Sequence, residues 1–497
     1  MEKKLYKSTG GDYNFLMAYP AIEEFALASL GYLWLFKIAD MMEGINAQRC
    51  STDLLPNISR VDAVAFSMSF DFDFMGVFEI LEKLKIPLYS KERDEKHPIV
   101  FAGGPVLTTN PRPYEVFFDF MIIGDGEDNF KQVLEILKNH EKQEALDLIK
   151  DIEGIYIPNS PVKKATAKLN DVIYTPIISD KGYFKDTFII EVARGCMNRC
   201  AFCTASYLNL PFRANDFDKI IDAIELGLNY TNKIALLGAQ ISAHPQFDEI
   251  MKYLSDKIDS GEKIEIGISS LRTDSVTPQM VQTLVKGGQK HSTIAIEAAS
   301  ERLRRFINKN LKEEQILNAV KISRENGLKG LKIYSMLGIP HETYEDLDEF
   351  IRLGKKIKSE NKGFGIEFSF SSFVPKPNTP FQWSIREDIK SLEKKQKYLE
   401  KELAKVGISA KFSSIKWDYW QSVISRADSE FASFLVEVYK RGGKIGAYKS
   451  ALKDWDLEVK NGFNPDDELP WDVISLEPRK QLLLNEYSRL EKRLNQL

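Results

Sequence analysis

Cysteine and histidine are both scarce in this chain, with four cysteines and five histidines among 497 residues. So few cysteines in a long chain exclude a disulfide framework. No apolar run approaches the roughly eighteen residues of a membrane-spanning helix. The first eight residues also lack the apolar core of a signal peptide. We therefore expect a cytoplasmic protein without a membrane span.

A large excess of charge of one sign is also missing, because the formal net charge at pH 7 is only −4. This balance gives no reason to expect general nucleic-acid binding. Hydrophobic residues make up 43% of the chain and charged residues 28%, as in globular proteins. The length exceeds what one ordinary hydrophobic core supports, so the sequence predicts several domains.

Three of the four cysteines, Cys196, Cys200 and Cys203, lie in one short segment with the spacing C-x3-C-x2-C. Thiolates are the usual ligands of iron–sulfur clusters, and a cubane cluster normally takes four of them. Three cysteines on one loop would leave the fourth iron open for a substrate or cofactor. A structural zinc site is disfavoured, because it needs four ligands and Cys50 is the only other cysteine.

The cysteine segment, with Phe202 before the last cysteine, resembles the signature of radical S-adenosylmethionine (SAM) enzymes. The resemblance implies that Cys196, Cys200 and Cys203 bind one [4Fe–4S] cluster whose open iron chelates SAM. It also implies reductive cleavage of SAM to a 5′-deoxyadenosyl radical, which modifies an unactivated carbon. The implied partners are a reductant such as flavodoxin or ferredoxin and a substrate that the sequence does not identify.

Residues 1–178 are predicted to form an N-terminal doubly wound Rossmann-like α/β domain. Buried strands are expected at residues 14–19, 61–67, 98–102 and 118–123, and glycine-containing turns follow the last two. The alternation of strand, turn and helix indicates a parallel sheet. Ligands of such sheets bind beyond the carboxyl ends of the strands.

This layout resembles the cobalamin-binding domain that precedes many radical SAM cores. In that domain an Asp-x-His-x-x-Gly motif usually supplies a histidine to cobalt, but residues 19–25 of this chain contain no histidine. If cobalamin binds, we expect no histidine ligand from the protein, and we expect Ser67, Ser69, Gly103 and Gly104 to line the corrin. Two alternatives stay open: the domain has lost the cofactor, or the glycines serve only as turn residues.

Residues 179–385 are predicted to form the radical SAM core, a partial (β/α)6 TIM-like barrel. The cysteine loop follows an apolar strand at residues 187–192, so it would lie on the face where barrel enzymes place their chemistry. An arginine fork suits the SAM carboxylate, whereas Glu297 could instead form a salt bridge to Arg272 or Arg304. The residues that the resemblance assigns to SAM binding are Gly238, Gln240, Ser270, Arg272 and Glu297.

A second specific string lies at residues 366–383. It resembles a Phe-Val-Pro-Lys-Pro-His-Thr-Pro-Phe-Gln-Trp signature of uncharacterised radical SAM proteins with a cobalamin-binding-like domain, except that Asn378 replaces the histidine. Residues 386–497 are helical in pattern, with a lysine-rich amphipathic stretch at their start. We expect a mainly helical C-terminal domain there.

These features favour a radical SAM enzyme, with methyl transfer from cobalamin if that cofactor binds. A cobalamin-free radical SAM enzyme of another reaction type is the first alternative. A non-catalytic iron–sulfur redox or scaffold protein is the second, and it is disfavoured because electron-transfer clusters usually take four protein ligands. Methylthiotransferases need three further cysteines for a second cluster, whereas Cys50 alone is left over.

Overall fold

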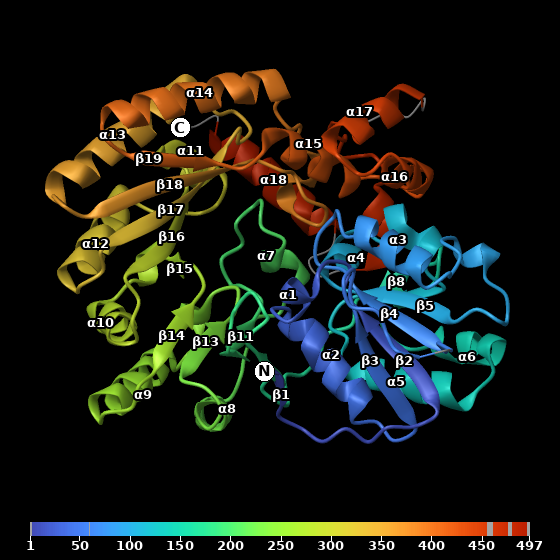
Figure 1. The fold of residues 1–497 in the computed structure, drawn as a ribbon. Helices are drawn as coiled ribbons and strands as arrows, with labels where there is room; N and C mark the ends of the chain where they lie inside the picture. The colour runs from blue at the N-terminus through green and yellow to red at the C-terminus, as the bar shows by residue number, and fades with distance from the viewer. Residues whose placement is uncertain (1, 59, 455–460, 476–479, 495–497) are drawn as a thin grey trace.

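Two α/β units face each other in the computed structural model, which describes residues 2–58, 60–454, 461–475 and 480–494. Figure 1 shows the N-terminal unit on the right and a crescent of strands and helices on the left. The short helix α7 (Ala205–Leu208) lies between the two units. None of the helices within the described ranges is long and apolar enough to cross a membrane.

The N-terminal unit is built on a sheet with the strand order β3-β2-β4-β5-β6-β7. All neighbouring strands are parallel except β7, which is antiparallel to β6. β4, β5 and β6 are short apolar runs because both faces of a parallel sheet are buried, whereas the edge strand β3 carries Asn46, Gln48 and Arg49. The strands of this sheet are β2 (Tyr13–Ala18), β3 (Ile45–Cys50), β4 (Ala63–Ser67), β5 (Ile99–Gly103), β6 (Phe120–Ile122) and β7 (Ile155–Tyr156).

Helices cover both faces of this sheet, so the predicted doubly wound domain is confirmed. Apolar side chains of α1, α2, α5 and α6 pack on one face, and those of α3 and α4 pack on the other. Chain order reverses between β2 and β4, and sheets of this kind bind ligands at the carboxyl ends of such a strand pair. The helices are α1 (Glu23–Ala26), α2 (Leu30–Asp40), α3 (Phe74–Lys83), α4 (Pro105–Thr109), α5 (Glu127–Asn139) and α6 (Lys142–Ile149).

The crescent is a partial barrel of parallel strands, as predicted. Its strand order is β10-β13-β14 followed by β15-β16-β17-β18-β19, and Ser269 and Ser270, which belong to no strand, separate the two sets. The strands are β10 (Thr187–Glu191), β13 (Lys233–Leu237), β14 (Glu265–Ile268), β15 (Leu271–Arg272), β16 (His291–Glu297), β17 (Gly330–Leu337), β18 (Gly365–Ser372) and β19 (Ser409–Phe412).

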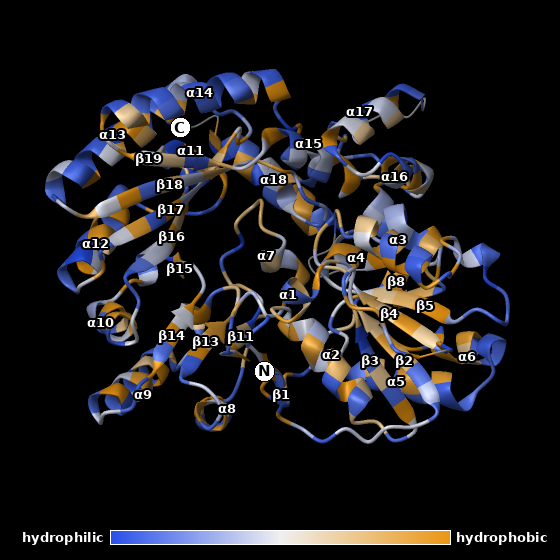
Figure 2. Cartoon of the chain, viewed as in Figure 1, coloured by the Kyte–Doolittle hydropathy of each residue, from blue (hydrophilic) through white to orange (hydrophobic). Residues whose placement is uncertain are grey.

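Helices alternate with these strands along the chain and cover the outer face of the crescent (Figure 1). Figure 2 shows that α13 and α14 are hydrophilic along much of their length, whereas β4 and β5 are hydrophobic. These helices are α8 (Phe217–Leu228), α9 (Phe247–Asp259), α10 (Pro278–Lys286), α12 (Glu313–Glu325), α13 (Tyr344–Glu360) and α14 (Ile389–Lys405). The short helix α11 (Glu301–Phe306) instead packs at the carboxyl ends of the strands, in the apolar cluster that contains Ala201.

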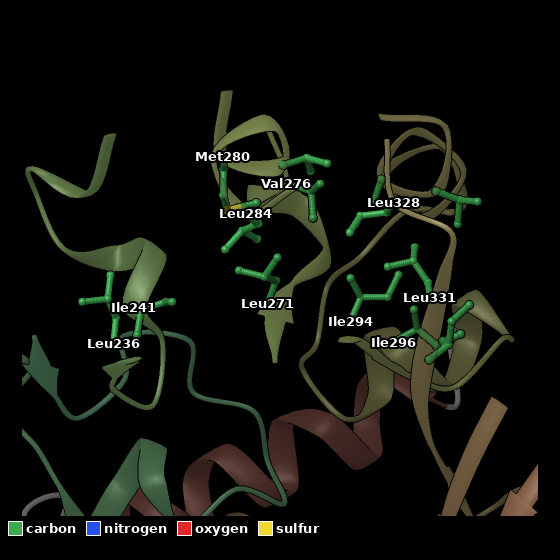
Figure 3. Close-up of a cluster of buried hydrophobic side chains, with 14 of the residues drawn as sticks. Leu236, Ile241, Leu271, Val276, Met280, Leu284, Ile294, Ile296, Leu328 and Leu331 are labelled. Atoms are coloured by element: carbon green, nitrogen blue, oxygen red, sulfur yellow. The ribbon is translucent and has the colours of Figure 1, made fainter. Parts of the chain in front are cut away.

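Aliphatic side chains fill the space between the strands and the outer helices. In Figure 3, Leu271 lies beside Leu284 of α10, and Ile294 lies beside Leu331 of β17, and all four side chains are buried. Alternate residues of a strand point to opposite faces of a sheet. Ile294 and Ile296 face this outer layer, and β16 ends at Glu297, where its pairing with β17 shifts register.

The segment after residue 385 is mainly helical, but its elements pack on different parts of the molecule. β19 continues the crescent as a parallel neighbour of β18. α15 (Ile415–Ile424), α16 (Phe431–Lys440) and α17 (Ile445–Asp454) join the hydrophobic core of the N-terminal unit. α18 (Lys480–Leu494) packs against α11. The domain boundaries at residues 178 and 385 stay a prediction.

The string at residues 366–383 connects the two units. Lys376 Nζ lies 2.6 Å from Asp71 Oδ2, and Asn378 Nδ2 donates to the Thr109 carbonyl oxygen at 2.9 Å. The amide oxygen of Gln382 accepts from the Asn378 backbone N–H at 3.0 Å. At the position where the resembling signature has histidine, Asn378 thus holds the barrel to the end of α4.

Candidate active site

The cysteine loop follows β10 at the carboxyl end of the first strand of the crescent, where the sequence predicts it. At its base β11 (Ala193–Arg194) pairs with β12 (Arg213–Ala214), and α7 follows the last cysteine. Gly195 has a φ of +84°, and a Cβ there would lie 2.3 Å from the Asn209 carbonyl oxygen. The loop therefore needs glycine beside Cys196.

The three loop cysteines are free thiols, of which Cys200 is buried and Cys196 and Cys203 are partly exposed. The Cys203 backbone N–H donates to the Cys200 carbonyl oxygen at 3.0 Å. Burial raises the pKa of the Cys200 thiol to about 12, although the nearby Lys309 acts in the opposite direction. Such a thiol becomes a thiolate most readily by binding a metal.

The donor set, three thiols on one loop, is of the kind that holds an iron–sulfur cluster. Among the described residues, no three His, Cys, Asp or Glu side chains converge on one metal position. Ligands of a cubane bind different irons and need not converge. Each loop thiol is nevertheless close enough to affect its neighbour, because Cys203 raises the pKa of Cys200 and Cys196 raises that of Cys203.

Gly238 and Gln240, which follow β13, contact the cysteine loop itself. The Cys196 thiol donates to Gln240 Oε1 at 3.5 Å, and Asn198 Nδ2 donates to the same oxygen. A Cβ at Gly238 would lie 2.9 Å from the Ala193 carbonyl oxygen. Both residues therefore shape the loop, and their contact with SAM stays a prediction.

Arg272 and Glu297 lie near Cys200, whereas Ser270 is exposed immediately before β15. The expected salt bridge of Glu297 to Arg272 or Arg304 is wrong, because Glu297 Oε1 pairs with Lys309 Nζ at 3.0 Å. Arg304 is buried and binds backbone carbonyls instead. Arg272 Nε pairs with Asp274 at 2.7 Å.

The backbone at Glu297 and on both sides of Lys309 has positive φ angles, which are often found at functional sites. Glu297 has a φ of +66° next to a register shift in β16. A glutamate in this region is uncommon, and such strain concentrates at ligand sites. Lys309, which the sequence analysis does not single out, is buried between two asparagines that also have positive φ. The Asn-Lys-Asn run was the available sequence signal.

A cavity of about 520 Å³ lies between the N-terminal sheet and the cysteine loop, a size typical of small-molecule sites. All four residues predicted to line the corrin, Ser67, Ser69, Gly103 and Gly104, line this cavity. No histidine is among its lining residues in the part of the chain that the structure describes. The opposite wall comes from β10, β13 and the segment after Cys203, through Glu191, Leu237, Thr204, Ala205 and Leu208.

Backbone geometry alone accounts for one of the cavity glycines. Gly104 has a φ of +121°, and a Cβ there would lie 2.2 Å from the Met68 carbonyl oxygen. The tight turn thus requires glycine whether or not a ligand binds. A Cβ at Gly103 would lie 3.3 Å from the Ile122 carbonyl oxygen, a closer approach than most side chains have but a milder one.

Arg194 joins the cysteine loop to the N-terminal unit at the cavity wall. Its guanidinium lies 2.6 Å from Glu127, 2.7 Å from Glu191 and 3.0 Å from Asp125. Arg213 pairs with Asp125 at 2.7 Å. Burial alone would raise the pKa of Asp125, but Arg194 and Arg213 outweigh it and hold that pKa below its usual value.

Comparisons with known proteins agree with this geometry. The family described as "Radical SAM proteins, N-terminal" matches residues 23–158, and the Radical SAM superfamily matches residues 190–354. An uncharacterized protein of Methanocaldococcus jannaschii is 32% identical over 389 residues, which cover 76% of this chain and 80% of that protein. An uncharacterized methyltransferase of Pyrococcus horikoshii is 22% identical over 362 residues, or 67% of this chain and 75% of that protein.

A solved structure shares the fold across both units. It is the cobalamin-dependent SAM radical enzyme OxsB with aqua-cobalamin and SAM bound, at a TM-score of 0.57 and 13% identity. The alignment covers 97% of this chain and 80% of the OxsB chain. The chain belongs to the radical SAM superfamily. It is therefore an enzyme of the class that uses SAM and a [4Fe–4S] cluster and requires a reductant.

We expect Arg272→Ala to weaken SAM binding by about 10- to 100-fold, because a lost hydrogen bond to a charged group costs about 1.5–3 kcal/mol. Equilibrium dialysis of SAM against the reconstituted protein measures the change. Arg305→Ala is the matched control, since Arg305 is exposed and pairs with Glu301 on α11. Unchanged affinity in both Arg272→Ala and Glu297→Gln would show that neither residue binds SAM.

Proposed function

We propose that this enzyme is a cobalamin-dependent methyltransferase that acts on an unactivated carbon. The observation that carries the proposal is the shared cavity, which is lined by Ser67 and Gly103 at the strand ends and by Thr204 and Ala205 beside the cysteine loop. A group bound at the end of the N-terminal sheet would therefore adjoin the SAM site. The similarity to an uncharacterized methyltransferase and the fold of a cobalamin-dependent enzyme support this assignment.

The cluster, in this proposal, is held by Cys196, Cys200 and Cys203. When bound, the [4Fe–4S] cluster supplies the electron that cleaves SAM, and cobalamin supplies the methyl group. Arg272 pairs through Nε with Asp274 and donates through Nη2 to the Lys309 carbonyl oxygen, which leaves Nη1 as a donor for the SAM carboxylate. Glu297 pairs through Oε1 with Lys309 and offers its other oxygen as an acceptor for the SAM ammonium or ribose. Both bond to Lys309, and the preceding residues Ile307 and Asn308 bond to the cysteine loop, so SAM bound to them would also lie near the cluster loop.

The cavity walls suit a corrin in two respects. Leu30, Trp34 and Phe130 provide apolar surface from helices α2 and α5, which excludes water from the site. The Ser67 hydroxyl at the end of β4 offers a hydrogen bond to a ligand amide. An apolar pocket with a few placed polar groups is the usual design of a cofactor site.

Cobalamin bound here is expected to have no histidine ligand from the protein, because none of the five histidines lines the cavity. The full-length protein is reconstituted with cobalamin, and the electron paramagnetic resonance (EPR) spectrum of the Co(II) form is recorded. We expect no nitrogen hyperfine coupling from a protein imidazole. Five single His→Gln variants provide the control, and each should leave the spectrum unchanged.

Two results would contradict this proposal at different levels. A strong axial nitrogen coupling that disappears in one His→Gln variant would show that the corrin binds elsewhere. Reconstitution that leaves no corrin on the protein, followed by its absorbance, would contradict the methyltransferase assignment. The cobalamin-free radical SAM enzyme would then be the better description.

A further inference from the structure

A short loop after α11 holds the cysteine loop on both sides of Cys200. We call residues 307–310 the clasp loop. It binds the residues immediately before and after Cys200 through one backbone and one side-chain hydrogen bond. These run from Ala201 N–H to the Ile307 carbonyl oxygen at 2.9 Å and from Asn308 Nδ2 to the Arg199 carbonyl oxygen at 2.8 Å.

The clasp loop is itself fixed in place. Asn308 and Asn310 have φ values of +56° and +52°, a conformation that asparagine adopts more readily than most residues. The buried Arg304 donates through Nε to the Leu311 carbonyl oxygen at 2.7 Å and through Nη1 to the Ala298 carbonyl oxygen at 3.0 Å. These bonds tie the end of the loop to the end of β16, so its side chains have defined positions.

Lys309 belongs to the clasp loop, and only 9% of its side chain is exposed. Its Nζ pairs with Glu297 at 3.0 Å, and its carbonyl oxygen accepts from Arg272 Nη2 at 3.1 Å. The clasp loop that carries Lys309 is bonded to the residues on both sides of Cys200, so this buried ammonium group lies close to Cys200. A buried charge needs compensation, and the carboxylate of Glu297 supplies it for Lys309.

We propose that Lys309 is a positioning residue that sets the electrostatic potential at the cluster held by Cys200, with Glu297 as its counter-charge. The inference rests on the proposed binding of the cluster by the three cysteines. Reduction makes a cluster more negative, so a fixed positive charge nearby favours the reduced form and a negative charge opposes it. Loss of Lys309 therefore lowers the midpoint potential, and loss of the Glu297 charge raises it.

The test measures the midpoint potential of the cluster by EPR-monitored redox titration of the full-length protein, reconstituted anaerobically with iron and sulfide. Lys309→Met should lower the ratio of reduced to oxidised cluster at a fixed potential by about tenfold, which is about 59 mV for a one-electron couple. Lys309→Arg should restore most of the loss, and Glu297→Gln should shift the potential in the opposite direction. Lys321→Met on α12 is the control, since Lys321 is exposed.

Each result decides the proposal. An unchanged potential in Lys309→Met would overturn it, and so would equal shifts in Lys309→Met and Lys309→Arg. If Lys309→Met binds no iron, Glu297→Gln decides alone, because only a rise in its potential supports the proposal. A wild-type protein that binds no iron after reconstitution would contradict the cluster assignment instead, so the two failures are distinguishable.

Discussion

Cys200→Ala is expected to abolish cluster binding, whereas Cys50→Ala is expected to retain it. Cys200 lies in the cysteine loop between two hydrogen bonds from the clasp loop, close to Cys203. A cubane that already has one open iron loses a second protein ligand when Cys200 is removed. Cys50 ends β3 and is buried in the core of the N-terminal sheet, where apolar surroundings raise the pKa of its thiol to about 12.

Iron and acid-labile sulfide per chain, measured after anaerobic reconstitution, separate the two variants. Cys50→Ala is the matched control because it removes the same side chain from a buried position. Full loss of iron in Cys50→Ala with a normal thermal unfolding temperature would show that Cys50 is a ligand. Retention of the full iron content in Cys200→Ala would show that the loop does not hold the cluster.

The strand pattern made the N-terminal sheet and the barrel predictable from sequence. Val64, Val100 and Met121 belong to short apolar runs followed by small residues, and each lies in a buried parallel strand. Parallel strands are buried on both faces, so hydrophobicity alone marks them. The position of the cysteine loop could then be predicted as well, because the active sites of barrel enzymes lie at the carboxyl ends of the strands.

The partner of Glu297 could not be predicted in the same way. Arg272, Arg304 and Lys309 all lie within reach of β16 along the chain, and residue type does not distinguish among them. The choice depends on Arg304, whose bonds to backbone carbonyls remove it as a partner and fix the loop that carries Lys309. Tertiary hydrogen bonds of this kind leave no periodic pattern in the sequence.

The contacts that connect the two units could also not be predicted from the sequence. Asn378 stands in a specific string, but its partner, the Thr109 carbonyl oxygen, is 269 residues away. The packing of α15, α16 and α17 on the N-terminal unit could not be predicted either. The sequence of an amphipathic helix shows which face is apolar, but it does not show which part of the protein packs on that face.

Arg194→Met is expected to lower the free energy of unfolding by about 3–5 kcal/mol near neutral pH, because it leaves buried carboxylates without a partner. Glu127 and Glu191 would lose their guanidinium contacts, and Asp125 would keep only Arg213. Urea unfolding of the full-length protein measures the change. Arg199→Met is the matched control in the same loop, since the Arg199 side chain is exposed.

The loss of unfolding free energy in Arg194→Met should become smaller as the pH falls. In the wild type, Arg194 and Arg213 outweigh burial and lower the pKa of Asp125. Its stabilising contribution is therefore present above the unfolded-state pKa of about 3.9 and is lost only as the pH falls through the lower folded value. In the variant, burial is opposed only by Arg213 and by the backbone N–H of Ala167, so the pKa of Asp125 rises.

As the pH falls, Asp125 therefore becomes protonated at a higher pH in the variant than in the wild type. Protonation removes the unfavourable buried charge from the variant, while the wild type still has its ionised pair. The difference in unfolding free energy should thus be larger at pH 7.5 than at pH 5. A difference that is the same at both pH values would show that Arg194 acts through packing and not through charge. A loss of similar size in Arg199→Met would show that any change in the cysteine loop destabilises the protein, and the connection through Arg194 would then have no special role.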